Sequence, residues 1–324
     1  MPSPSDAFLT ATIGVSAIDV AEYGLLVADV FNAYARNPGA IQPPALGNSL
    51  FGKLQHDQQV VGYLVAQDAL VSPLTGKREL SPNQVCYGAL MKFKSTYVIA
   101  IRGTANMREW IIDAECALVD HPTNGQVEEG FWSVYATMKY VPAGQNAALP
   151  AVDTIAGIIG AGSVMIVGHS LGAAIAEYLA FDLVQKPGMN PVTGCFFASP
   201  RPGDGKFADA FDKAFQNQGG KYVVINYDAD VVPTLPPIEN GFCPLPVTLR
   251  LMNGTVDQTW TVRDDLLCNH HVICYAAMLA SGAAQQYAAD SGAPATWPSL
   301  LAANNDQSNC LTDGPDLRDE GEGG

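Results

Sequence analysis

The chain has 324 residues, of which 48% are hydrophobic and 15% charged, so it can bury a large core and global disorder is excluded. Its net charge of -15, from 17 basic and 32 acidic residues, gives a surface that repels phosphates. Nucleic acid is therefore excluded as a partner, and anionic membranes are disfavoured.

The N-terminal part of the chain is apolar but differs from a membrane anchor. Residues 7–35 are interrupted by Asp19, Glu22 and Asp29, which favours helices of a globular domain. The stretch also lacks the basic start and the cleavage site of a signal peptide. We expect a soluble protein without a transmembrane segment, cytoplasmic in the first instance, or secreted if the chain is a mature form.

Strand-like and helix-like segments alternate through the middle of the chain. In chain order they are strands at 85–93 and 97–102, helices from 107 and over 131–140, a strand at 164–167, a helix at 171–184, a strand at 193–199, a helix at 206–215 and a strand at 222–226. This alternation is typical of an α/β fold with a mostly parallel sheet and helices on both faces.

The last quarter of the chain predicts smaller elements. Residues 249–252 and 259–263 predict a hairpin that turns at Asn253-Gly254, and a final helix is expected over 272–280. Residues 306–324 combine acidic residues with glycine and predict a solvated, flexible tail. We expect one α/β domain over residues 1–305, with a helical N-terminal segment, followed by this acidic tail.

The stretch Gly168-His169-Ser170-Leu171-Gly172 has the form Gly-x-Ser-x-Gly and lies between a predicted strand and a predicted helix. A serine at such a turn is exposed at the top of the sheet, and the glycines remove side chains that would collide there. The start of the following helix supplies unpaired backbone N–H groups, which suit a developing oxyanion. The pattern predicts that Ser170 is a nucleophile.

A serine nucleophile needs a base that is oriented by a carboxylate, and on this type of sheet the chain order is serine, acid, histidine. Of the five histidines, only His270 and His271 follow Ser170 with room for an acid between. The acid is expected directly after the strand at 222–226, where Asp228 and Asp230 lie. The residues alone leave both choices open.

The seven cysteines include no CxxC pair, so zinc spacing is absent and neither a metal nor another cofactor is expected. Cys195 lies in a strand-like segment and is interpreted as a buried apolar residue. Cys243 and Cys268 lie in loop-like regions and are the candidate pair for a disulfide in an oxidising compartment.

Six blocks in the same order resemble the class 3 (fungal-type) lipase family of α/β-hydrolases. They are Arg102-Gly103-Thr104, the segment from Arg108 to Asp113, Gly130-Phe131, the elbow from Gly168 to Gly172, Pro200-Arg201-Pro202-Gly203 with Phe207-Ala208, and Asp230-Val231-Val232-Pro233 with Leu235-Pro236-Pro237. The resemblance spans residues 85–275. Glu128-Glu129 and Pro202 depart from the family pattern at positions that carry no catalysis.

The resemblance also implies roles for individual residues. It makes Asp230 the acid, and the spacing to Tyr275 favours His270 over His271 as the base. It implies the backbone N–H groups of Leu171 and Thr104 as the two oxyanion donors. We therefore expect a catalytic set of Ser170, Asp230 and His270, with His271 as the alternative base.

The segment at 105–115 predicts a lid. Met107, Trp110, Ile111 and Ala114 recur at helical spacing on one side, a pattern that a permanently packed helix would also give. The segment directly follows the predicted strand at 97–102 and the predicted oxyanion donor Thr104. This position favours a mobile helix that covers the serine in water and exposes an apolar surface at an oil–water interface.

Together these features predict a serine ester hydrolase. A triacylglycerol lipase that acts through an acyl-serine is the first expectation. A carboxylesterase, a feruloyl esterase and a phospholipase A1 are the alternatives on the same scaffold. A non-catalytic, lipase-like interaction protein is the alternative of another class.

Overall fold

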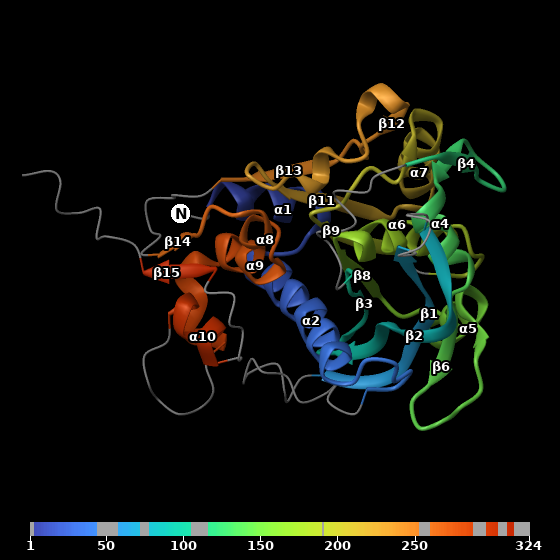
Figure 1. Ribbon diagram of the computed structural model, residues 1–324, viewed down its shortest axis with the longest axis horizontal. Helices are drawn as coiled ribbons and strands as arrows, with labels where there is room; N and C mark the ends of the chain where they lie inside the picture. Colours follow the sequence, from blue (N-terminus) through green and yellow to red (C-terminus); the bar gives the residue numbers. More distant parts are fainter. Residues whose placement is uncertain are drawn as a thin grey trace, which may run out of the picture.

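A nine-stranded sheet forms the centre of the computed structural model, which describes residues 3–43, 58–71, 78–104, 116–189, 191–252, 260–287, 296–303 and 310–313 (Figure 1). The strand order is β13-β11-β9-β8-β3-β2-β1-β6-β7. The strands are β1 (Gln58–Val71), β2 (Arg78–Phe93), β3 (Thr96–Ile101), β6 (Lys139–Pro142), β7 (Leu149–Pro150), β8 (Val164–His169), β9 (Val192–Phe197), β11 (Lys221–Tyr227) and β13 (Thr248–Leu251).

The sheet has a parallel half and an antiparallel half. Strands β3, β8, β9, β11 and β13 pair in parallel, and β2, β1, β6 and β7 extend the sheet by antiparallel pairing. The parallel half contains the serine turn, and its strands are nearly continuous apolar runs because both faces are covered. The predicted α/β fold class is confirmed.

Two groups of helices cover the two faces of the sheet (Figure 1). Along β8, Met165 and Val167 pack into the core that contains α1, α2 and α9, whereas Val164 and Ile166 pack into the core that contains α4 to α7. This alternation follows from the two-residue period of a strand. The helices are α1 (Pro4–Ile13), α2 (Ala17–Arg36), α4 (Glu129–Ala136), α5 (Ala151–Ile159), α6 (Leu171–Val184), α7 (Gly205–Gln218) and α9 (Val272–Leu279).

The two N-terminal helices begin at serine caps. The side chain of Ser3 accepts the N–H of Asp6, and that of Ser16 accepts the N–H of Asp19, which satisfies amides that the helices leave unpaired. Helix α2 packs on the sheet and on α9. In the described part of the chain no single helix is long and apolar enough to cross a membrane. Only α1 and α2 taken together, bent by 82°, pass that test by length and composition.

Smaller elements flank the central sheet. They are the four-stranded sheet of β12 (Phe242–Cys243), β10 (Gly203–Asp204), β5 (Gln126–Glu128) and β4 (Leu118–Asp120), the strands β14 (Trp260–Val262) and β15 (Leu311–Asp313), the helices α8 (Leu266–Asn269) and α10 (Trp297–Ala303), and the short 3-10 helices η2 (Val232–Thr234), η3 (Ile238–Asn240) and η4 (Ser281–Tyr287).

Three expectations for secondary structure and disulfide pairing are wrong. The helix predicted over 131–140 ends at Ala136, because Lys139–Pro142 pairs with β1. The pairing predicted between residues 249–252 and 259–263 is wrong, because β13 joins the central sheet parallel to β11 and β14 pairs with β15, while the predicted turn at Asn253-Gly254 lies outside the described residues. The disulfide joins Cys268 to Cys310, and Cys243 is free.

The last segment differs from the predicted tail. Cys310 is disulfide-bonded and Leu311–Asp313 pairs with β14, so this part of residues 306–324 is tied to the fold. Its composition is acidic, but Leu311 contributes an apolar side chain to the core. The rest of the predicted tail, residues 306–309 and 314–324, lies outside the described residues.

Candidate active site

Ser170 lies at the junction of β8 and α6 with a backbone conformation of φ 61° and ψ -135°. Such a conformation costs a non-glycine residue about 1–3 kcal/mol and persists only where the surroundings enforce it. The N–H of Ser170 donates to the carbonyl of Phe197 on β9 at 3.0 Å, and the carbonyl of Ser170 accepts the N–H of Ala173 at 2.8 Å. These bonds hold the strained turn on both sides.

The glycines of the motif are required by close backbone approaches. A Cβ atom at Gly168 would collide with the backbone of Gly172, and one at Gly172 would collide with the carbonyl of Arg102 on the neighbouring strand. A Cβ at Gly103 would lie 3.0 Å from the Cβ of Ser170. The elbow and the end of β3 are therefore packed backbone to backbone.

Arg102 fixes the end of β3 from inside the core. Its guanidinium is fully buried, donates to the carbonyl of Cys86 at 2.8 Å and to that of Gly103 at 2.7 Å, and lies 3.5 Å and 4.4 Å from the ring centroids of Tyr34 and Tyr87. Cation–π contacts of this kind are favourable when desolvated. The sequence motif contained Arg102, but its anchoring role became visible only in the structure.

Thr104 directly follows Gly103, the glycine that lies close to Ser170. Leu171 follows Ser170 in the chain and is the first residue of α6. Both residues are thus on the chain segments that border the serine. Their function as oxyanion donors remains a prediction.

Asp230 follows β11 and is the carboxylate that the structure brings to a histidine. Its Oδ2 accepts Nδ1–H of His270 and the hydroxyl of Tyr275, each at 2.7 Å, and its Oδ1 accepts the N–H of Val232 at 2.9 Å. The side chain is buried. Asp228 instead lies half exposed, 3.6 Å from Arg250.

Tyr275 contributes a second fixed donor to Asp230. Its hydroxyl accepts the N–H of Tyr227 at 3.0 Å and donates to the carboxylate. Burial raises the pKa of Tyr275 well above its ordinary value, so the hydroxyl keeps its proton. Asp230 therefore holds its orientation through side chains and backbone from two elements.

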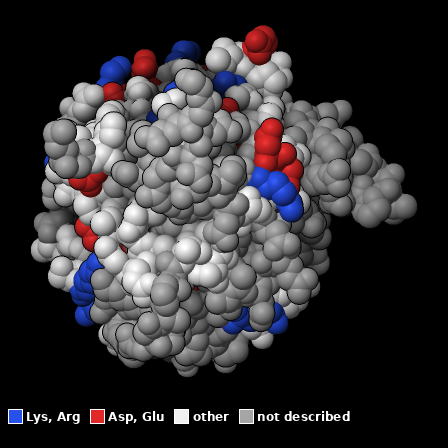
Figure 2. Space-filling model, turned by 90° about the vertical axis from the view of Figure 1, so that its left-hand side faces the viewer, with Lys and Arg blue, Asp and Glu red and all other residues white. Residues whose placement is uncertain are grey.

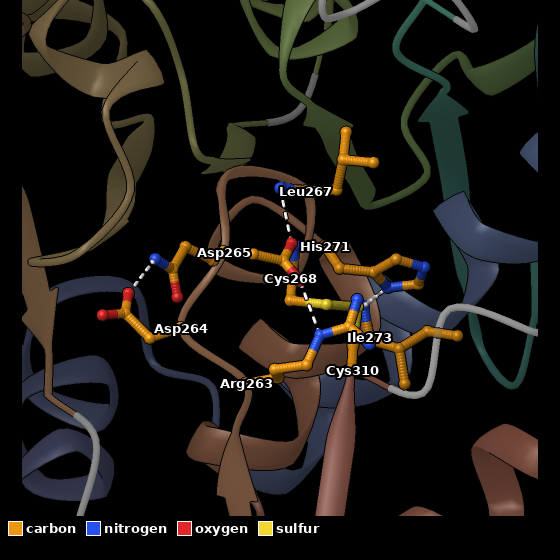
Figure 3. Close-up of a disulfide and its surroundings, with 9 residues drawn as sticks. Arg263, Asp264, Asp265, Leu267, Cys268, His271, Ile273 and Cys310 are labelled. Atoms are coloured by element: carbon orange, nitrogen blue, oxygen red, sulfur yellow. Dashed lines mark hydrogen bonds and ion pairs between the residues drawn. A yellow bond between two sulfur atoms is a disulfide. The ribbon is translucent and has the colours of Figure 1, made fainter.

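The two adjacent histidines have different environments. His270 is buried, and its Nε2 has no hydrogen-bond partner among the described residues, while its Nδ1 is held by Asp230. His271 caps α9, because its Nδ1 accepts the N–H of Ile273 at 3.2 Å (Figure 3). The geometry therefore assigns the Asp230 partner to His270, and gives His271 a structural contact.

A short, covalently tied helix precedes His270 (Figure 3). Asp265 caps α8 by accepting the N–H groups of Leu267 at 3.0 Å and Cys268 at 2.9 Å. Cys268, two residues before His270, is bonded to Cys310 with a Cα–Cα distance of 4.9 Å. The loop that carries His270 is therefore anchored both by a cap and by a disulfide.

Among the described residues, no group of three or more His, Cys, Asp or Glu side chains could hold a metal ion. The predicted lid residues Met107, Trp110 and Ile111 lie outside the described residues. The lid stays a prediction.

Comparison with solved structures defines the fold class. A deletion mutant of the Rhizomucor miehei lipase, in complex with its propeptide, matches with a TM-score of 0.51 and 20% identity, over 80% of this chain and 75% of that chain. At this identity the likeness is one of fold, and together with the serine turn after β8 it gives the protein the α/β-hydrolase fold.

Residues 98–240 match the Lipase (class 3) family. The predicted resemblance to class 3 lipases is confirmed over this segment. It covers the end of β3, the elbow and Asp230, but ends before His270.

Two curated relatives are similar over part of their length. Phospholipase A1-II 4 of Oryza sativa subsp. japonica is 33% identical over 164 residues, which are 44% of this chain and 40% of the relative. Secreted mono- and diacylglycerol lipase 1 of Fusarium solani is 31% identical over 188 residues, which are 56% of this chain and 52% of the relative. This chain thus spans about half or less of the length of these relatives.

Loss of the disulfide should destabilise the protein. The double variant Cys268→Ser/Cys310→Ser removes a cross-link between segments 42 residues apart, and we expect the free energy of unfolding to fall by roughly 2–4 kcal/mol. Urea denaturation monitored by tryptophan fluorescence measures this change. Cys243→Ser, at a free cysteine, is the control and should leave the midpoint nearly unchanged. Equal midpoints for all three proteins would show that the cross-link contributes nothing.

Proposed function

We propose that this protein is a serine ester hydrolase in which Ser170 is the nucleophile, His270 the base and Asp230 the orienting acid. The observation that carries the proposal is the 2.7 Å hydrogen bond between His270 Nδ1 and the buried Asp230. His270 also contacts the residue next to the nucleophile, since the rings of His169 and His270 lie 4.6 Å apart. The strained turn at Ser170 adds a second, independent support.

The reaction follows from these positions. Nε2 of His270 takes the hydroxyl proton of Ser170 as Oγ attacks the ester carbonyl, and the resulting imidazolium is stabilised by Asp230. The backbone N–H groups of Leu171 and Thr104 stabilise the negative oxygen of the tetrahedral intermediate. His270 then gives the proton to the leaving alcohol, and water releases the acyl group from Ser170 by the same steps.

The substrate class is proposed from the relatives and from the predicted lid. One relative is named as a phospholipase A1 and the other as a mono- and diacylglycerol lipase. Both names describe enzymes that act on lipid esters. We propose such esters, with triacylglycerol as the first candidate and phospholipid as the second. The predicted lid at 105–115 supports a water-insoluble substrate.

The charge of the surface bears on the phospholipid alternative. Figure 2 shows one face on which the described acidic and basic side chains lie in small mixed groups. Arg263 and Asp265 form an ion pair of opposite charges, 2.5 Å apart. The overall charge of -15 favours a neutral lipid or a zwitterionic head group over an anionic one.

An oxidising compartment is part of the proposal. The bond between Cys268 and Cys310 is of the kind that persists outside the reducing cytosol, and the Fusarium relative is named as secreted. Both observations favour secretion over the cytoplasmic location that the sequence favoured first. We also propose that residues 1–305 belong to a single hydrolase domain, and that this domain extends to residues 310–313, which the disulfide and the pairing of β15 with β14 tie to it.

The variants Ser170→Ala, His270→Ala and His271→Ala test the mechanism. Ester hydrolysis should fall by several orders of magnitude in the first two, because each removes a group that takes part in acyl transfer. His271→Ala should stay within about tenfold of the wild type, since the Nδ1 of His271 caps α9 and makes no contact with Asp230 in the proposed mechanism. The measurement is kcat for a soluble ester, with circular dichroism as the control for folding. Substantial activity of Ser170→Ala, or a greater loss for His271→Ala than for His270→Ala, contradicts the mechanism.

An acyl chain-length series tests the substrate class. Esters of increasing chain length are assayed below and above their solubility limits, beside dispersed triacylglycerol and phosphatidylcholine. A lipase with a lid should gain activity sharply above the solubility limit and should prefer long chains. Preference for short or aromatic esters with no such gain assigns a soluble esterase, and faster release from phosphatidylcholine assigns a phospholipase.

A further inference from the structure

His169, the last residue of β8, contacts the base loop across the active site. Its Nε2 lies 2.7 Å from the backbone carbonyl oxygen of His270, which is 101 residues away in the sequence. Because a carbonyl only accepts, Nε2 must carry the hydrogen. The two imidazole rings also pack at a centroid distance of 4.6 Å and an interplanar angle of 39°.

The surroundings of His169 keep it neutral. Burial and the nearby His270 lower the pKa of His169 well below its ordinary value. A neutral imidazole carries one N–H, and the bond to His270 fixes this hydrogen on Nε2. His169 therefore adds no positive charge next to His270 when His270 becomes an imidazolium.

We propose that His169 is a positioning residue for the base, an inference that rests on the proposed function. Asp230 fixes the side chain of His270 through Nδ1, and His169 fixes its backbone through the carbonyl. Two fixed points, one on each side of the Cα–Cβ bond, define the direction of the free Nε2.

The covalent neighbourhood makes this contact specific. His169 is directly bonded to Ser170, so one side chain links the nucleophile strand to the loop that carries the base. The disulfide of Cys268 anchors the same loop to the C-terminal segment, which lies on another element. Of these two anchors, the disulfide holds the loop to the C-terminal segment, and the His169 contact holds it to the strand that carries the nucleophile.

Two substitutions at this position separate the donor from the ring. His169→Gln keeps an N–H donor near the place of Nε2, whereas His169→Phe keeps an aromatic ring and removes the donor. We expect His169→Phe to lower kcat by about 10-fold to 100-fold with KM unchanged, because the base is misplaced rather than the substrate. His169→Gln should stay within about fivefold of the wild type.

A matched control uses another histidine packed among aromatic rings. His121 contacts Trp132, Phe181 and Phe207 and accepts backbone N–H groups of its own turn. His121→Phe should lower the melting temperature without changing kcat. A wild-type kcat for His169→Phe, equal losses for Phe and Gln, or a change in KM alone overturns the inference.

A spectroscopic measurement keeps this test separate from the proposed function. The Nδ1 proton of His270, shared with Asp230, gives a downfield proton resonance whose exchange with water reports the order of the base loop. We expect this exchange to accelerate in His169→Phe and to stay slow in His169→Gln, whether or not an ester is cleaved. Unchanged exchange in His169→Phe overturns the positioning role, whereas an inactive wild type with normal resonances rejects only the proposed function.

Discussion

The backbone of Gly172 passes so close to the carbonyl of Arg102 that no side chain fits between them. This approach joins the first turn of α6 to the end of β3, and it brings the two chain segments on either side of Ser170 together. Arg102 holds its own end of the contact through a buried guanidinium that bonds the carbonyls of Cys86 and Gly103. The position of Ser170 therefore depends on a backbone contact between the first turn of α6 and the end of β3, which Arg102 supports from the core.

Asp230 and His270, the proposed acid and base, approach this turn at the carboxyl ends of the parallel strands. Asp230 follows β11, two strands beyond β8, and receives three hydrogen bonds that fix both of its oxygens. His270 lies between α8 and α9, and its loop is anchored by the disulfide and by His169. Parallel strands make this convergence possible, because their carboxyl ends meet at one edge of the sheet. Contacts of the disulfide and of His169 thus hold the loop of His270 in addition to its bond with Asp230.

The sequence was sufficient for the features that depend on local pattern and chain order. Apolar runs and the Gly-x-Ser-x-Gly turn predicted the parallel half of the sheet, and the order serine, acid, histidine reduced five histidines to His270 and His271. Contacts between residues far apart in the chain could not be predicted from the sequence. The partner of Cys268 is Cys310, which directly precedes β15, and β15 pairs with β14. The strand before Asn253-Gly254, β13, pairs with β11 of the central sheet and not with β14. The difference between His270 and His271 is likewise one of tertiary contact, since one meets Asp230 and the other caps a helix.

The most direct test of the account is covalent labelling by a fluorophosphonate, which reacts with a serine only when a base and an oxyanion site activate it. Intact-mass spectrometry of the full chain should detect one adduct per molecule, and peptide mapping should locate it on Ser170. An adduct on a different serine, or no adduct on a folded protein, would contradict the assignment of Ser170, His270 and Asp230 as a catalytic set.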